Sequence, residues 1–264
     1  MSLPERHPWL LIVLPLLACW PVWQWMAERA TDGSGDPWEL LSLVTAVVFI
    51  GQRRKTHASG SRRLALPAAL VVLYALSYPF LPPLLRAMVA VSAIGACLSA
   101  VCFDRPLHVP LWGLLLLSLP LIASFNFYLG YPLRVVVGSA TAALLQMNGF
   151  AVLRDGTLLN WNGQTIAVDA PCSGVKMLWT GGYLCCTLAA FQGLDAGKTV
   201  LLCLLGLVVV IGSNILRASA LFYVESGVVP LPTQWHAGVG VAIFVLTALA
   251  ITALAQKLGK HHAD

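Results

Sequence analysis

The stretch DAPCSGVKMLW, residues 169–179, joins a polar turn to a long apolar run. We expect the run to form a helix with Cys172 at or next to its N-terminus. Backbone N–H groups there lack intrahelical partners, and the positive end of the helix dipole favours an anion. A thiol in that position has a lowered pKa, and its thiolate is a nucleophile. The alternative is that Cys172 is one more small apolar residue of a membrane helix.

The composition indicates an integral membrane protein. Of the 264 residues, 58% are hydrophobic and only 10% are charged, with a mean hydropathy of +0.80. A soluble domain has about 25% charged residues. The apolar runs approach the ~20 residues that a helix needs to cross a bilayer, and the alternating pattern of a membrane barrel is not visible. The net charge of +5 does not indicate a nucleic-acid partner, because the basic residues cluster beside apolar runs.

The apolar runs predict an all-α polytopic protein with about eight transmembrane helices. Pro15 and Pro21 are expected to kink the first of them. The expected spans are residues 8–27, 38–52, 64–80, 86–102, 109–128, 172–192, 199–218 and 236–256. We expect one membrane domain over residues 1–264, with a five-span part (1–130) and a catalytic part (131–256).

The part that precedes Cys172 has a different pattern. Residues 131–150 are apolar but interspersed with polar side chains, which favours an amphipathic or re-entrant helix near the outer surface. Residues 151–168 switch to a period of two, with turn pairs at Asp155-Gly156 and Asn162-Gly163. The sequence therefore predicts a small extracytoplasmic β-hairpin element that leads directly into Cys172.

Basic residues set the expected orientation. The segment RRKTHASGSRR, residues 53–63, holds five Lys and Arg residues and is the strongest inside marker. With both termini inside, the inner segments carry ten Lys and Arg residues and the outer segments carry four. This bias predicts a multi-pass protein of the cytoplasmic (inner) membrane, with both termini cytoplasmic.

That orientation places three reactive or charged groups at the outer face. Cys172 begins one span there, Arg217 ends the next, and His236 begins the last. Each has an alternative: Arg217 could extend to the lipid headgroups, and His236 could be an interfacial residue that caps a helix. Charged residues inside spans are costly and usually face a cavity or a partner. Because all three groups fall at one depth, we interpret them as one site.

Two neighbouring residues could support this site. Lys176, one turn after Cys172, could extend to the headgroups or add positive potential near the thiolate. Asn214, one turn before Arg217, could orient the arginine or pair with another helix. The seven cysteines show no CxxC or Cys/His metal spacing, so we expect no metal and no organic cofactor.

The chemistry open to the three groups is acyl transfer. Cys172 can attack a peptide carbonyl, and His236 can take the thiol proton and give it to the leaving amine. Arg217 can donate hydrogen bonds to the developing oxyanion or hold a substrate carboxylate. The acyl-enzyme then passes to an amine or hydroxyl acceptor, or to water.

At these residues the sequence resembles the exosortase/archaeosortase family of membrane cysteine transpeptidases. The matching blocks are Cys172-Ser173-Gly174, the Asn-x-x-Arg block from Asn214 to Arg217, and His236 near the start of the last span. The resemblance is strongest over residues 131–256. Two departures, the proline before Cys172 and Lys176 where the family commonly has arginine, indicate a divergent branch.

The resemblance implies a function that composition alone does not. Such proteins recognise a C-terminal signal on exported proteins: a short motif, typically of PEP-CTERM type in bacteria, then a transmembrane helix and a basic tail. They cleave it near the outer face, so the implied partners are that protein substrate and membrane lipids.

Two functions of other classes remain open from the residues alone. A polytopic transporter could use Arg217 and His236 to line a substrate path, although it should show internal repeats and broken helices at the bilayer midplane. A structural subunit of a polysaccharide-export or secretion assembly would need no reactive cysteine.

Overall fold

The computed structural model describes residues 9–31, 38–52, 64–167, 174–230, 232 and 235–260. The chain divides into two compact units, and each is described by itself. The first contains residues 1–123 and 186–200, and the second contains residues 124–185 and 201–264. The basic segment 53–63, our strongest inside marker, lies outside the described residues. The expected single membrane domain over residues 1–264, with its parts 1–130 and 131–256, stays a prediction.

The first unit contains several short helices and one longer helix. They are α2 (Leu10–Ala18), α3 (Trp20–Thr31), α4 (Trp38–Gln52), α5 (Ala65–Ser77), α6 (Pro83–Phe103) and α7 (Val109–Leu117). The expected kink in the first apolar run is confirmed, because α2 and α3 meet at an angle of 63° around Cys19. Pro21 stands at the second position of α3, where its missing N–H costs nothing.

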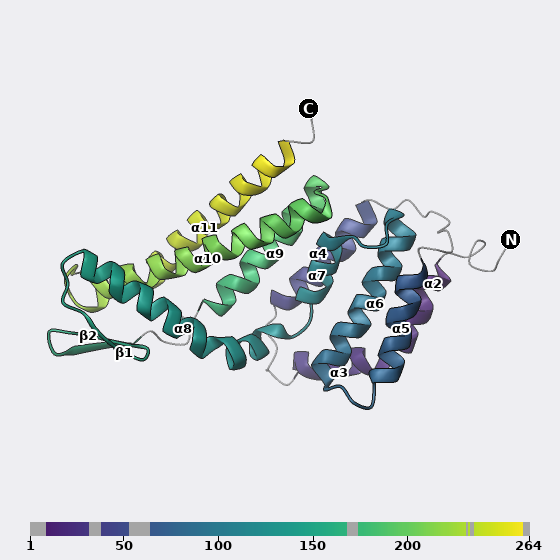
Figure 1. The fold of residues 1–264 in the computed structure, drawn as a ribbon, viewed down its shortest axis with the longest axis horizontal. Coiled ribbons are helices and arrows are strands. Elements are labelled where there is room, and N and C mark those ends of the chain that lie inside the picture. The colour runs from purple at the N-terminus through teal and green to yellow at the C-terminus, as the bar shows by residue number, and fades with distance from the viewer. Residues whose placement is uncertain are drawn as a thin grey trace. The chain divides into compact units, whose positions relative to one another are not determined.

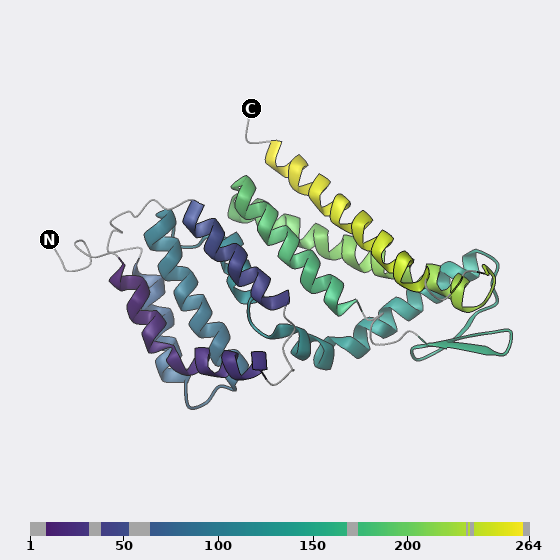
Figure 2. The same ribbon diagram turned by 180° about the vertical axis from the view of Figure 1, so that it is seen from behind.

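Helix α6 lies at the centre of the first unit and packs against α2, α3, α5 and α7 (Figures 1 and 2). Small residues make this possible. Several alanines of α6 are fully buried, and a β-carbon at Gly95 would lie 2.9 Å from the indole of Trp112 in α7. Small residues let the backbones of membrane helices approach closely, so van der Waals packing holds them together.

Buried polar side chains satisfy helix ends in this apolar unit. His108 precedes α7, and its Nδ1 accepts a hydrogen bond from the Leu111 N–H at 3.3 Å. The carboxylate of Glu39, in the first turn of α4, accepts one from the Ile122 N–H at 3.0 Å and is only 5% exposed. Ile122 lies at the start of helix α8 (Leu121–Met147), where N–H groups lack intrahelical partners.

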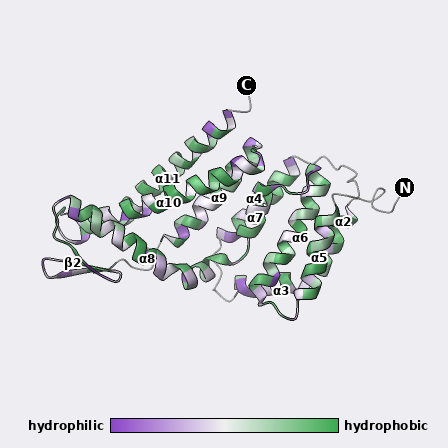
Figure 3. Ribbon diagram, viewed as in Figure 1, coloured by the Kyte–Doolittle hydropathy of each residue, from purple (hydrophilic) through white to green (hydrophobic). Residues whose placement is uncertain are grey.

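The second unit contains most of α8, a small sheet and the greater part of three further helices. The helices are α9 (Val175–Gln192), α10 (Ala196–Glu225) and α11 (Trp235–Lys260). Apolar residues dominate the helices, and hydrophilic residues gather at ends such as the C-terminal turns of α11 (Figure 3). Exposed leucines and valines on α10 and α11 fit helices that face lipid.

The sheet has three antiparallel strands in the order β1 (Leu153–Asp155), β2 (Leu158–Trp161) and β3 (Gln164–Ala167). The expected β-hairpin element is therefore two consecutive hairpins. Asn162 and Gly163 both have positive φ, at 48° and 77°, as a type I′ turn requires. In the first turn only Gly156 has positive φ, which is the type II′ pattern.

The sheet contributes to a buried core in the second unit. Leu159 and Ile166 face residues of α8 and α10, and Phe150 and Trp161 pack around Phe222 with ring centroids 5.7 and 5.8 Å apart from it. The core holds the strands against α8 and α10. The segment before Cys172 is thus attached to the helix that carries Asn214 and Arg217.

The helix boundaries correct three expectations. The expected span 109–128 is divided between α7 and α8. Residues 131–150 do not form a separate helix, because α8 continues through Pro132 to Met147. The expected span 199–218 is part of a longer helix, because α10 extends from Ala196 to Glu225. A proline in a membrane helix does not have to end it, since neighbouring groups compensate for the lost hydrogen bond.

The chain is a multi-pass, all-α membrane protein with a small sheet, but the count of eight spans is not confirmed. Among the described residues, four helices are long and apolar enough to cross a membrane, or five with the bent pair α2 and α3. The four begin at Pro83, Leu121, Ala196 and Ala237. Helices α4 and α5 are apolar but shorter.

Replacing Glu39 by alanine should destabilise the first unit, because the Ile122 N–H would lose its buried acceptor. We expect a loss of about 1–3 kcal/mol in the free energy of unfolding, measured by denaturant unfolding in detergent. Glu39→Gln keeps an acceptor oxygen and should lose less. The control is Glu28→Ala, at an exposed site of α3, which should change stability by under about 0.5 kcal/mol. Equal effects at both sites would contradict the capping role.

Candidate active site

The structure describes some of the expected site residues and not others. Cys172 and Ser173 lie outside the described residues. The backbone of His236 belongs to the first turn of α11, but its side chain is not described. Gly174, Lys176, Asn214 and Arg217 are described in full. The geometry around these four residues shows how α9, α10 and α11 meet.

Gly174 is the residue from which α9 begins. Its carbonyl accepts a hydrogen bond from the Leu178 N–H at 2.8 Å, the first bond of the helix. Its φ is +82°, a backbone conformation that glycine adopts without steric cost. Helix α9 begins at Val175, three residues after Cys172 in the sequence. Because Cys172 is outside the described residues, its expected position at or next to the helix N-terminus stays a prediction.

Gly174 lies directly against Asn214 of α10. A β-carbon at position 174 would lie 2.7 Å from Nδ2 and 3.0 Å from Cγ of Asn214. Asn214 is 2% exposed. The expected Cys-Ser-Gly block and Asn-x-x-Arg block are therefore in contact through these two residues, and no larger side chain fits at 174.

Arg217 lies one turn after Asn214 and approaches α11. A β-carbon at Gly240 would lie 3.4 Å from Nε and 3.7 Å from Nη2 of Arg217. Nε itself is buried. Gly240 stands four residues after His236, about 6 Å along the helix axis and on the same side of α11. The guanidinium of α10 is thus held close to the first turns of α11.

Close contacts continue along the same three helices. A β-carbon at Gly181 of α9 would lie 2.5 Å from Cγ2 of Val210 in α10 and 3.7 Å from Cδ1 of Ile251 in α11. A β-carbon at Gly206 of α10 would lie 2.5 Å from the sulfur of Cys185 in α9. Glycines on α9 and α10 therefore fix how these helices pack, and with it the register of Asn214 and Arg217.

Lys176 differs from the other described site residues. Its side chain is exposed in the first turn of α9, and its carbonyl accepts a hydrogen bond from the Thr180 hydroxyl at 2.7 Å. It takes no part in the glycine contacts. Among the described residues there is also no group of three or more His, Cys, Asp or Glu side chains that could hold a metal ion.

Sequence reasoning missed the role of Gly240. The run AGVGVA, residues 237–242, contains two glycines in an otherwise apolar helix, and such glycines often mark a close approach of another group. The contact of Gly174 with Asn214 could not be read from the sequence either, because it depends on the packing of two helices.

A comparison with known protein families identifies the chain. The sequence model of the transmembrane exosortases (Exosortase_EpsH) matches residues 9–253. The chain belongs to the transmembrane exosortase family. No curated protein and no solved structure matches it.

Family membership gives the coarse function. Exosortases are membrane cysteine transpeptidases for the sorting signals of exported proteins, so this exosortase is a protease-like membrane enzyme with a protein substrate. This favours the transpeptidase over the transporter and the structural subunit. The match also covers residues before 131, whereas the motif blocks quoted above all lie between residues 131 and 256.

Replacing Gly174 by alanine should disrupt the site. The new β-carbon would collide with Asn214, and alanine is strained at a φ of +82°. We expect at least a tenfold loss of sorting-signal cleavage, measured on a co-expressed substrate. Gly163→Ala is the matched control, since Gly163 has a φ of +77° and open space around it. It should cost about 1 kcal/mol of stability or somewhat more but retain cleavage; similar losses in both variants would contradict the importance of the Asn214 contact.

Proposed function

We propose that this exosortase cleaves the C-terminal sorting signal of exported proteins through a thioester on Cys172. His236 is the general acid and base, and Arg217 stabilises the oxyanion or holds the substrate. The active site faces the extracytoplasmic side of the inner membrane, and both termini are cytoplasmic. The substrate carries a motif of PEP-CTERM type, a transmembrane helix and a basic tail.

The first half of the reaction forms the acyl-enzyme. His236 takes the proton of the Cys172 thiol, and the sulfur attacks the carbonyl carbon of the scissile peptide bond. The carbonyl oxygen becomes an oxyanion in the tetrahedral intermediate. The C–N bond then breaks, and the imidazolium gives its proton to the leaving amine. The products are a thioester on Cys172 and a released C-terminal segment with a free amino group.

The second half releases the sorted protein. An amine, hydroxyl or water acceptor loses its proton to His236 and attacks the thioester carbonyl. The C–S bond breaks, and the sulfur recovers a proton from the imidazolium. Arg217 has the same task in both halves, because the same carbonyl oxygen becomes negative each time.

The contacts of Gly174 and Gly240 carry this proposal. They link the start of α9 to Asn214, and Arg217 to the first turns of α11. The start of α9, which follows Cys172 in the sequence, and the first turns of α11, to which His236 belongs, therefore both lie close to the Asn-x-x-Arg block. A guanidinium that packs against the backbone of a neighbouring helix is restrained, as preorganised stabilisation of an oxyanion requires.

The test is processing of a co-expressed reporter that ends in a sorting motif, an apolar helix and a basic tail taken from the same proteome. Cys172→Ala and His236→Ala should abolish the size change of the reporter on gels. Arg217→Ala should slow it by about 10²–10³-fold. The control is Cys97→Ala, because Cys97 is a buried free cysteine of α6 in the first unit, and processing should continue.

Membrane fractionation of each variant shows whether it is still inserted. If an inserted Cys172→Ala variant processes the reporter at the parental rate, the thioester mechanism is excluded. If His236→Ala alone is active, general acid–base catalysis has to be assigned to another group.

Arg217→Lys separates charge from geometry. Lysine keeps the positive charge but lacks the planar, five-donor guanidinium. We expect processing at least tenfold slower than in the parent, measured as the initial rate with the same reporter. Full activity of this variant would show that a point charge suffices, and the proposed hydrogen bonds to the oxyanion would then be wrong.

A further inference from the structure

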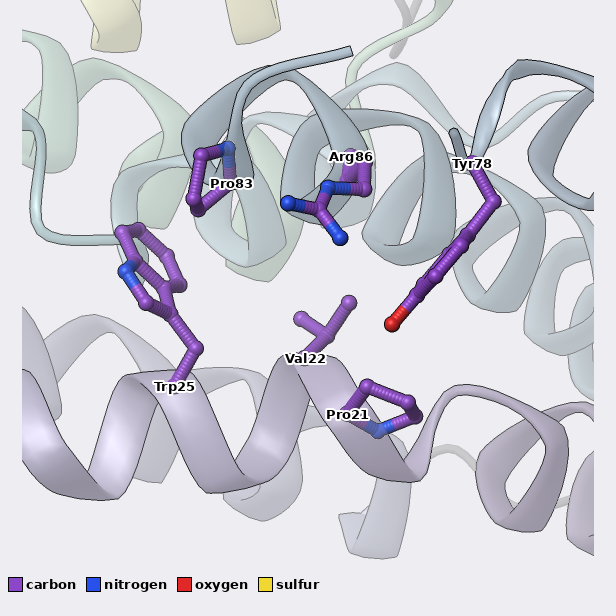
Figure 4. A pocket seen from close by; sticks show the side chains of 6 residues that line it. All are labelled: Pro21, Val22, Trp25, Tyr78, Pro83 and Arg86. Carbon is purple, nitrogen blue, oxygen red and sulfur yellow. The ribbon is translucent and has the colours of Figure 1, made fainter. Parts of the chain in front are cut away.

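A cavity in the first unit is lined by residues that take no part in the proposed reaction. It has a volume of about 120 Å³ and lies between α3, the residues after α5 and the start of α6. Its lining comprises Pro21, Val22, Trp25, Tyr78, Pro83 and Arg86 (Figure 4). Arg86 is the single charged residue among these six.

The guanidinium of Arg86 points into the space between Trp25 and Tyr78 (Figure 4). Its central carbon lies 4.7 Å from the centroid of the Tyr78 ring. Its Nε is buried and has no hydrogen-bond partner within the part of the chain that the structure describes. Among the described residues, no carboxylate lines the cavity. Arg86 as a whole is half-buried, and a partly buried cation without a counter-charge among the lining residues favours an anion.

The position of Arg86 in its helix adds to this preference. It lies in the first turn of α6, which begins at Pro83. The N-terminus of a helix carries a partial positive charge, so a cationic side chain there is unfavourable. An anion beside the guanidinium would offset both positive charges at once.

The size and surroundings of the cavity limit the kind of anion. An apolar cavity of about 150 Å³ holds one benzene molecule, so 120 Å³ accommodates one small group and not a cofactor. Helix α6 is long and apolar enough to cross a membrane, and a span of this length would place its first turn near the headgroups. The aromatic rings of Trp25 and Tyr78 are typical of that level. A small anionic head on an apolar body fits this place.

We infer that this cavity binds the phosphate of a membrane lipid. Arg86 donates two parallel hydrogen bonds to phosphate oxygens, the arrangement that a guanidinium favours. Tyr78 holds the guanidinium from one side through its ring. Val22 and Trp25 contact the apolar atoms next to the phosphate.

The experiment measures binding of short-chain phosphatidic acid to the purified full-length protein in detergent, by native mass spectrometry and by the shift in unfolding temperature. The parent should bind phosphatidic acid at least tenfold more tightly than diacylglycerol with the same chains. Arg86→Gln should lose at least tenfold in affinity. Arg105→Gln removes the same charge at an exposed site beyond the other end of α6 and should bind like the parent.

Two further variants keep the test decisive if Arg86→Gln does not fold. Val22→Phe fills the cavity and leaves Arg86 in place, so it should also lose at least tenfold. Arg86→Lys keeps the charge without the planar fork and should bind several-fold more weakly. Parental affinity in all variants that fold would overturn the inference. An excess of inorganic phosphate that displaces the lipid completely would show a site for free phosphate and overturn the assignment to lipid.

Discussion

The close approach of α9 to α10 at Gly174 is the constraint on which the proposed active site depends. Only the absence of a β-carbon lets the backbone of Gly174 lie against the buried amide of Asn214. Helices in lipid gain little from burying apolar side chains against one another, so packing of small residues and hydrogen bonds decide their register. A shift of one turn between α9 and α10 would separate the Cys-Ser-Gly block from the Asn-x-x-Arg block.

Polar groups fix the first unit in a comparable way. Glu39 accepts the Ile122 N–H, and the Ser42 hydroxyl donates to the Leu114 carbonyl at 2.7 Å. Both side chains come from α4, which therefore holds one position relative to α7 and the start of α8. An unsatisfied polar group inside a membrane costs several kcal/mol, so each bond penalises any other arrangement of these helices.

Features set by local chemistry could be predicted from the sequence. The span 38–52 coincides with α4, the prolines marked the bend near Cys19, and both Gly-containing turn pairs delimit strands. These depend on apolar runs, on the missing N–H of proline and on positive φ at glycine. The polar residues of 131–150 misled the prediction for α8, because polar side chains in a membrane helix can face protein instead of water. Thr141, for example, is fully buried.

The candidate site, too, has features that could be predicted from the sequence and features that could not. The residue types at 172, 214, 217 and 236 indicated acyl transfer, and the family match supports that class. The contacts that bring α9, α10 and α11 together involve Gly174 and Gly240, and a glycine carries no chemical signal of its own. Their role becomes visible only in the structure, where the side chain of Asn214 or Arg217 lies beside the position that a β-carbon would take.

A comparison of three arginines in the described helices explains why we propose a catalytic role for Arg217 alone. Arg134 turns back on its own helix, where Nε donates to the Gly130 carbonyl at 3.3 Å and the guanidinium lies 5.9 Å from the Tyr131 ring. Arg86 faces a cavity. Arg217 packs against the backbone of another helix at Gly240. An arginine that only reaches for headgroups needs no such contact, since its long side chain extends to the membrane surface. The restraint across two helices is therefore better explained by a need to hold the guanidinium in one place.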